Sequence, residues 1–214
     1  LVYALLGLFS ALLLWRMPNA RRPAAIRPEA HRPASRQQRQ VALLYAALIA
    51  LVTFVSNGTS THLPEFIAHY GLPVAAGMLW GIGQTGARFL EVASGSVLTP
   101  LRLTLLTTLL MPVCFALGLS GPYLLGTAGG FVLGYGAING LTTVFKATLP
   151  LELFAAEDYA RRTGILLIPA QLLAAASPFA YAWLTQQFGV QGSLGFSAAL
   201  TLVVAGLALA IARS

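Results

Sequence analysis

Charged residues are scarce in this sequence: Asp, Glu, Lys and Arg together account for 9% of its 214 residues, against about a quarter in soluble globular domains. Apolar residues account for 57% of the chain, and the mean hydropathy is +0.76. These values exclude an ordinary soluble domain and indicate an integral membrane protein.

Cysteine is nearly absent as well, because Cys114 is the only one in the sequence. One cysteine excludes a disulfide within the chain and a metal site built from several thiolates. His62, Glu65 and His69 could share a helical face, but Pro64 interrupts the helical geometry that a metal site there would need. We therefore expect neither a metal nor a cofactor.

Long apolar runs are the main positive feature. Six apolar runs are long enough to span a membrane as a helix, or nearly so, since a spanning helix needs roughly 20 residues. They are residues 41–70, 73–95, 102–119, 123–146, 164–187 and 193–212. Glycine and proline separate these runs, as at Thr99-Pro100 and Phe188-Gly189. The sequence therefore predicts an all-α, polytopic membrane protein with a six-helix transmembrane bundle over residues 41–214.

Residues 1–15 form a shorter apolar run ahead of this bundle. As a helix they would rise about 22 Å, which is less than the hydrocarbon core of about 30 Å. We expect residues 1–15 to be the end of a truncated preceding transmembrane helix.

Positive charge gathers in residues 16–40, which contain seven arginines and four prolines. The prolines argue against helix and favour a flexible linker. When the spans are counted from this linker, every other Lys and Arg falls on the same side of the membrane, which the positive-inside rule makes the cytoplasmic side. We expect a cytoplasmic linker and C-terminus in a bacterial inner (plasma) membrane. The arginines lack the aromatic partners of a nucleic-acid surface, so we expect contact with anionic lipid and no nucleic acid.

An apolar segment, a long basic linker and six spans in this order resemble the C-terminal half of a major facilitator superfamily transporter, over residues 1–214. The family motif Gly-x-x-x-Asp-Arg/Lys-x-Gly-Arg/Lys-Arg/Lys follows the second helix of a half. The matching stretch here, GQTGARFLEVASGSVLTPLR, keeps Gly and Arg at a different spacing. The resemblance implies two inverted three-helix repeats, here 41–119 and 123–212, and an N-terminal six-helix bundle as partner. It implies a secondary active transporter, not an enzyme, that moves a small solute by alternating access, with proton coupling as one option.

Two other function classes stay open. An intramembrane enzyme would need a nucleophile and a base at one depth, and no histidine matches the depth of Ser94, Ser96 or Ser120. A non-transporting membrane scaffold would need only helix packing.

Polar side chains within the spans are the candidates for function, because they are costly in lipid unless they face a bundle interior or a wet cavity. In the second span, Gln84, Arg88 and Glu91 follow one another on one helical face. We assign Gln84 and Arg88 to a substrate cavity and Glu91 to proton coupling. Alternatively, Arg88 and Glu91 pair with each other and stabilise the cytoplasmic end of the helix.

The fourth span has two distinct faces. Gly126, Gly130 and Gly134 recur every four residues, a pattern typical of close helix packing. Asn139 lies about 140° around the helix from Gly134, and Thr142 follows it on the polar face. We assign Asn139 and Thr142 to the substrate cavity, the alternative being hydrogen bonds between helices.

The first span is too long for one simple crossing, and SNGTSTHLPEF interrupts it. We expect either a broken or kinked helix, or a helix that ends near residue 60. Asn57 in this stretch is a further cavity candidate. So is Gln171 in the fifth span, for which the alternative is a hydrogen bond between helices. His62 and Glu65 face the outer solution and are candidates for proton coupling.

Overall fold

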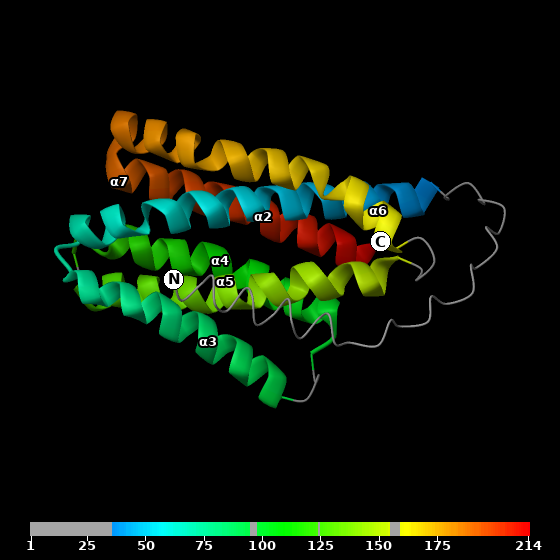
Figure 1. Ribbon diagram of the computed structural model, residues 1–214, viewed down its shortest axis with the longest axis horizontal. Coiled ribbons are helices and arrows are strands. Elements are labelled where there is room, and N and C mark those ends of the chain that lie inside the picture. Colours follow the sequence, from blue (N-terminus) through cyan, green and yellow to red (C-terminus); the bar gives the residue numbers. More distant parts are fainter. Residues whose placement is uncertain (1–35, 95–97, 124, 155–158) are drawn as a thin grey trace, which may run out of the picture. The chain divides into compact units, whose positions relative to one another are not determined.

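A computed structural model describes residues 36–94, 98–123, 125–154 and 159–214 (Figure 1). Its elements are α2 (Arg36–His69), the short 3-10 helix η1 (Val74–Ala76), α3 (Gly77–Ala93), α4 (Pro100–Ser120), α5 (Leu125–Leu153), α6 (Tyr159–Leu166) and α7 (Ile168–Arg213). No β-strand occurs in these ranges, in agreement with the predicted all-α class. The truncated helix expected over 1–15 and most of the expected linker lie outside the described residues.

Within the described ranges, three helical stretches are long and apolar enough to cross a membrane: Arg36–His69, Pro100–Ser120 and Arg162–Arg213. The length and composition of these helices indicate an integral membrane protein. α3 has 17 residues, the lower limit for a membrane-spanning helix. α5 is longer, with 29 residues, but it is not among these three stretches.

α2 continues through Gly58 and Pro64 to His69 as one helix. It neither breaks nor ends near residue 60, so the expected break and the expected early end are wrong, whereas the expected kink stays a prediction. A proline inside a helix removes one backbone hydrogen bond, which packing on its far side can offset. Phe66 and Ile67 lie beyond Pro64 and are buried in the core, so they hold the last turns of α2 in place.

Two helix boundaries differ from the expected ones by several residues. α2 begins at Arg36, inside the stretch expected to be linker, because the segment RQQRQ contains no proline and consists of good helix formers. α5 runs on past Pro150 to Leu153, since Phe145 and Leu149 are fully buried and extend its packed face.

The turns between helices follow their local sequence. Thr99 caps α4, where its side chain accepts a hydrogen bond from the Arg102 amide and Pro100 occupies the first turn. Gly71 (φ 66°) ends α2, and Gly189 (φ 68°) lies within α7. A residue with a side chain is strained at such angles. Gly189 therefore bends α7 into two helical parts that run back on each other (Figure 1).

Successive long helices run in alternating directions, so that several of their basic ends lie on the same side (Figure 1). The start of α2, the end of α5 and the C-terminus lie toward the right of that view, whereas α3 ends at its lower centre. Several basic helix ends thus lie on one side of the bundle, while the orientation expected from counting the spans stays a prediction.

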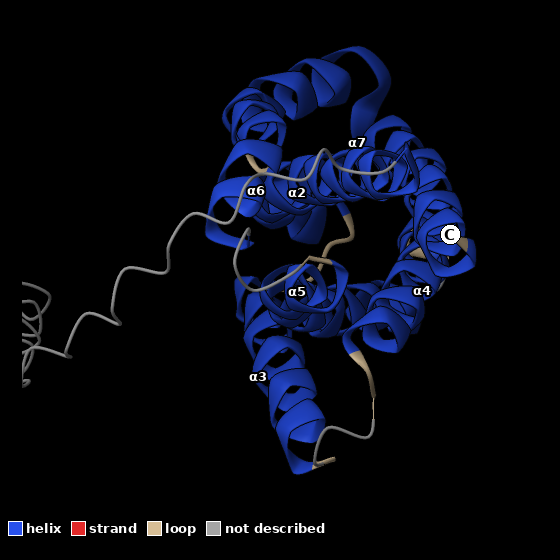
Figure 2. Cartoon of the chain, turned by 90° about the vertical axis from the view of Figure 1, so that its right-hand side faces the viewer, coloured by secondary structure: helices blue, strands red, loops and turns tan. Residues whose placement is uncertain are grey.

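The helices do not pack in chain order. α2 packs mainly against α7, whereas α5 packs against α3 and α4, and α4 also packs against α7. α2 has little contact with α3, although α3 is the next long helix along the chain. Figure 2 shows α3 on the outer side of α5, away from α2 and α7.

Glycine allows α3 and α5 to approach closely. A Cβ at Gly136 would overlap the backbone of Trp80, and a Cβ at Gly140 would lie 2.6 Å from the carbonyl oxygen of Gln84. On α3, a Cβ at Gly83 would overlap the carbonyl of Leu133. The backbones of the two helices are therefore in direct contact at this crossing.

These packing glycines are not the ones predicted. A Cβ added at Gly126 or Gly130 meets nothing within 4 Å, and one at Gly134 would lie 3.4 Å from Cys114 of α4. Gly136 lies about 200° around α5 from Gly134, so the close crossing uses a different face. The regular spacing of Gly126, Gly130 and Gly134 identified a helix rich in small residues but not the side on which α3 packs.

α3 packs Leu79 and Trp80 against the core but leaves a second apolar face uncovered. Met78, Ile82 and Phe89 are 71%, 61% and 70% exposed, and they line an open groove with Gly81 and other small residues. Gly83 is the one buried residue of this helix. Such a face needs lipid or another apolar surface to cover it.

Candidate functional site

The polar run SNGTST of α2 lies against α5 through Tyr135. This tyrosine is 1% exposed, and its hydroxyl donates to the backbone carbonyl of Ser56 at 2.7 Å. Ser60 Oγ lies 2.9 Å from the same hydroxyl, and because the phenol has one proton, Ser60 is the donor to Tyr135. The phenol thus joins two turns of α2 to α5.

Tyr181 of α7 makes the corresponding contact on the other side of α2. Its ring fills the space that a side chain at Gly58 would occupy, and its hydroxyl lies 2.7 Å from Ser197 Oγ, beyond the bend of α7. Thr59 is fully buried and lies beside both Tyr135 and Tyr181. A row of hydroxyl-bearing residues therefore crosses the core from α5 through α2 to α7.

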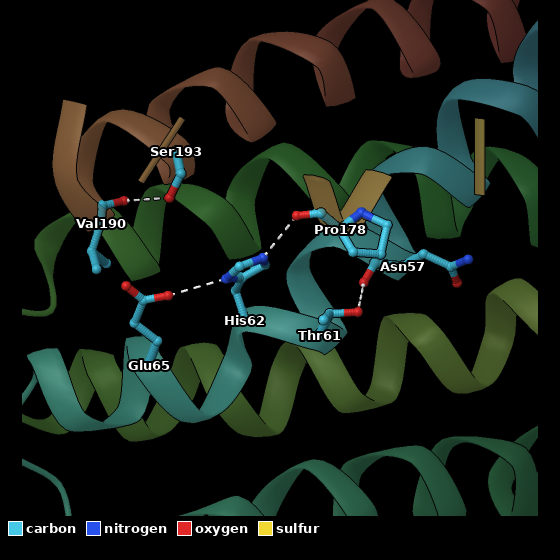
Figure 3. A network of polar contacts seen from close by, with 7 residues as sticks. All are labelled: Asn57, Thr61, His62, Glu65, Pro178, Val190 and Ser193. Atoms are coloured by element: carbon cyan, nitrogen blue, oxygen red, sulfur yellow. Dashed lines mark hydrogen bonds and ion pairs between the residues drawn. The ribbon is translucent and has the colours of Figure 1, made fainter. Parts of the chain in front are cut away.

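His62 lies one turn beyond this row and bridges α2 to α7 (Figure 3). Its Nδ1 is 3.0 Å from Glu65 Oε2, and its Nε2 is 3.1 Å from the backbone carbonyl oxygen of Pro178. The ring is stacked on Tyr181, with 6.3 Å between centroids. The His62 side chain is 15% exposed and that of Glu65 is 51% exposed, so solvent reaches the pair through Glu65.

The local sequence of α7 stabilises the backbone that His62 contacts. Pro178 has no amide hydrogen, which leaves the carbonyl of Ala174 without its usual helical donor. The hydroxyl of Ser177 donates to that carbonyl at 3.0 Å. α7 can therefore continue through Pro178.

The side chain of Arg88, on α3, forms hydrogen bonds to α5 rather than within its own helix. Its Nη2 donates to Thr143 Oγ1 at 2.8 Å, and its Nε donates to the carbonyl of Gly140 at 3.5 Å. The alternative in which Arg88 pairs with Glu91 is not what the structure has. The backbone carbonyl of Glu91 instead accepts a hydrogen bond from Ser94.

The other cavity candidates do not converge on one point. Gln84 and Asn139 are half-buried at the α3–α5 crossing, where the backbone of Gln84 meets Gly140. Thr142 is 1% exposed, whereas Asn57 and Gln171 are exposed. Of the assigned residues, His62 and Glu65 thus form one group, and the assigned residues of α3 and α5 form another.

Reasoning from the sequence identified His62 and Glu65 but missed most of the hydroxyl row. Tyr181, Ser197 and Thr59 carry no spacing that sets them apart from ordinary core residues. Tyr135 does lie on the same polar face as Asn139. The sequence contained one signal for this contact. Tyr135 lies within an apolar span, where a buried phenol needs a hydrogen-bond partner, and the run SNGTST offers such partners.

The described residues offer hydrogen bonding and proton exchange but no assembled nucleophile. His62 contacts a carboxylate and a carbonyl, and Cys114 is buried with its thiol directed at the carbonyl of Phe131. Acyl transfer would require a base beside a nucleophile. The groups between α2, α5 and α7 are instead suited to polar contacts across a helix interface.

Comparisons with family models, curated proteins and solved structures find no match to this chain.

Proposed function

We propose that this protein is a secondary active transporter of the major facilitator type, which moves a small solute across the membrane by alternating access. Two observations support the proposal: the resemblance seen in the sequence and the order in which the helices pack. It places the basic end of the bundle, including the C-terminus, in the cytoplasm of a bacterial cell.

The observation that carries the proposal is the exchange of packing partners. Let α2, α3 and α4 form one unit, and let α5 and the two parts of α7 form a second. The first helix of each unit then packs against the second and third helices of the other: α5 against α3 and α4, and α2 against α7. Phe54 of α2 contacts both parts of α7, with ring centroids 5.7 Å from Tyr181 and 6.5 Å from Phe196.

This exchange is the pattern expected of two three-helix repeats that interlock. Consecutive helices in an ordinary bundle are usually neighbours, whereas α2 and α3 have little contact. Inverted repeats are a common basis of transporter folds, with the substrate site at the interface between repeats. The hydroxyl row between α2, α5 and α7 supports a polar site at that interface.

The exposed face of α3 supports the second part of the proposal, a partner bundle. Its groove is lined by Gly81 and Gly86 together with the exposed side chains of Met78, Ile82 and Phe89. Small residues between larger apolar ones let another helix approach closely. The N-terminal six-helix bundle that the resemblance implies would pack against this face and complete the substrate cavity.

An intramembrane enzyme is the alternative that the geometry favours less, since the described residues do not bring a base next to a nucleophile. A scaffold would have no need of a water-accessible path. Accessibility to water therefore separates the transporter from the scaffold.

Cysteine substitution tests the proposed cavity. We expect Gln84→Cys and Asn139→Cys, in a Cys114→Ala background, to react with a water-soluble maleimide in membranes, because a thiol reacts as the thiolate and needs water. Substrate should change the rate of reaction. Leu202→Cys on the apolar second part of α7 is the matched control; this site is 62% exposed and should face lipid. Gln84→Cys and Asn139→Cys as unreactive as the control would contradict the proposal.

Uptake by the full-length protein in proteoliposomes, measured against a panel of small solutes, tests transport directly. We expect saturable uptake of at least one solute class, driven by an ion gradient. Uptake no greater than in empty liposomes for every class would favour the scaffold.

A further inference from the structure

The two hydrogen bonds of the His62 ring determine how many protons His62 and Glu65 must carry between them. The carbonyl of Pro178 can only accept, so a hydrogen bond at 3.1 Å requires a proton on Nε2. The 3.0 Å contact between Nδ1 and Glu65 Oε2 requires one more proton, carried by the imidazole or by the carboxyl group. The two contacts together therefore need one proton more than a neutral histidine and an ionised glutamate possess.

Loss of that proton breaks one of the two contacts. If the remaining proton stays on Nε2, the lone pair of Nδ1 faces an ionised carboxylate. If it moves to Nδ1, the lone pair of Nε2 faces the carbonyl oxygen of Pro178, and α2 loses this link to α7. Histidine is suited to this exchange, because either of its two ring nitrogens can carry the proton.

Among the residues that the structure describes, few other ionisable groups surround the pair. From the helices packed against this part of α2, the groups that face it are Tyr181 of α7 and Tyr135 of α5, whose hydroxyls are hydrogen-bonded to serines. His69 lies two turns further along α2 and is edge-on to Tyr70. The described cations of α4, α5 and α7 are Arg102 in the first turn of α4, Lys146 in the second half of α5 and Arg213 at the end of α7, and neither His62 nor Glu65 forms an ion pair with them. The charge of the pair is thus set by its own proton.

We propose that His62 and Glu65 form a binding site for a single proton, and that this proton holds α2 against α7 through the carbonyl of Pro178. The half-exposed Glu65 carboxylate exchanges the proton with water, while the mostly buried His62 transmits its presence to α7. Protonation fixes the interface between the two proposed repeats, and deprotonation releases it. The use of this proton for transport rests on the proposed function, whereas its binding and its effect on α7 do not.

Nitrogen-15 NMR of histidine-labelled protein in nanodiscs tests the proton count. The sequence has three histidines, so His62→Gln and His69→Gln assign the signals. We expect the pair to hold one proton more at acidic than at alkaline pH, and the loss of that proton to change the ring-nitrogen signals of His62. We expect Glu65→Gln to remove the shared proton, because a neutral amide can donate to Nδ1 without an exchangeable acid proton. His69→Gln is the matched control and should leave the His62 titration unchanged. A His62 titration that is the same in wild type and Glu65→Gln would overturn the inference.

Distance measurement tests the effect on α7. Spin labels at Ala68→Cys and Gln187→Cys, both exposed, report the separation of α2 and α7 in a Cys114→Ala background. We expect the distance distribution to shift or broaden as pH rises, and we expect this change to be lost in Glu65→Gln and retained in His69→Gln. A distribution that does not depend on pH in the otherwise wild-type protein would refute the role of the proton in holding α7.

These outcomes separate this inference from the proposed function. A pH-dependent distance in a protein that transports no solute would retain the proton site and reject the transporter. Solute uptake with equal pH dependence in wild type and Glu65→Gln would retain the transporter and reject the proton site as its coupling device.

Discussion

Tyr135 shows how much a single hydroxyl can contribute in this chain. Its phenol is 1% exposed and is bonded to both the Ser56 carbonyl and Ser60 Oγ. In lipid or in a packed core, neither oxygen of α2 can turn to bulk water instead. The hydroxyl therefore helps to hold α2 against α5.

We expect Tyr135→Phe to lower the free energy of unfolding by about 1 kcal/mol, because it removes hydrogen bonds worth roughly 0.5–1.5 kcal/mol each and leaves Ser60 without this partner. Denaturant unfolding in mixed micelles, followed by circular dichroism, measures the change. Tyr123→Phe is the control, since Tyr123 is 86% exposed and should be close to neutral. Equal stability of Tyr135→Phe and wild type would show that the phenol carries no net stabilisation.

At the scale of elements, the α3–α5 crossing depends on backbone contact. Gly136 and Gly140 place the backbone of α5 against that of α3, and Arg88 adds hydrogen bonds to Gly140 and Thr143 one turn further on. Rigid backbones cannot move aside as a flexible side chain can. The crossing therefore tolerates no additional atoms.

We expect Gly136→Ala to destabilise the protein by about 1–3 kcal/mol, the typical cost of overpacking a well-packed contact. Gly130→Ala is the matched control on the same helix, because a Cβ there meets nothing within 4 Å and alanine is the better helix former. Thermal unfolding of both variants in detergent gives the comparison. Equal melting temperatures for the two variants would contradict the close α3–α5 contact.

At the scale of the whole molecule, the alternating directions of the long helices bring several of their basic ends to the same side (Figure 1). His62, Glu65 and His69 belong to the other end of α2. A membrane protein with this charge distribution is oriented by its basic end. The proposed proton site would then face the outer solution.

Cysteine labelling in intact cells checks this orientation. We expect an impermeant thiol reagent to label Val74→Cys, which lies before α3 and is exposed, and to label Ser94→Cys only after the membrane is permeabilised. The pair is matched, because the two sites flank the same helix. Labelling of both sites before permeabilisation would contradict a crossing by α3.

The sequence supported different conclusions at these three scales. Apolar runs, prolines and glycines predicted the helices and most turns, including those at Thr99 and Gly189. The predicted break of α2 was wrong, because burial of Phe66 beyond Pro64 outweighs one lost backbone bond. The repeat organisation and the transport function stay proposals.

The sequence by itself determined the membrane character, the helical class and the clustering of positive charge, since these depend on composition and on period along the chain. Only the tertiary structure decided which side chains meet. Tyr135, Tyr181 and Pro178 lie far along the chain from the α2 residues that they contact. Those contacts follow from α2 packing against α7 and α5 more than against α3, and residue spacing within one helix does not predict which helix becomes its neighbour. The partners of His62, and with them its proton count, therefore emerge from the packing of helices and not from the spacing of residues.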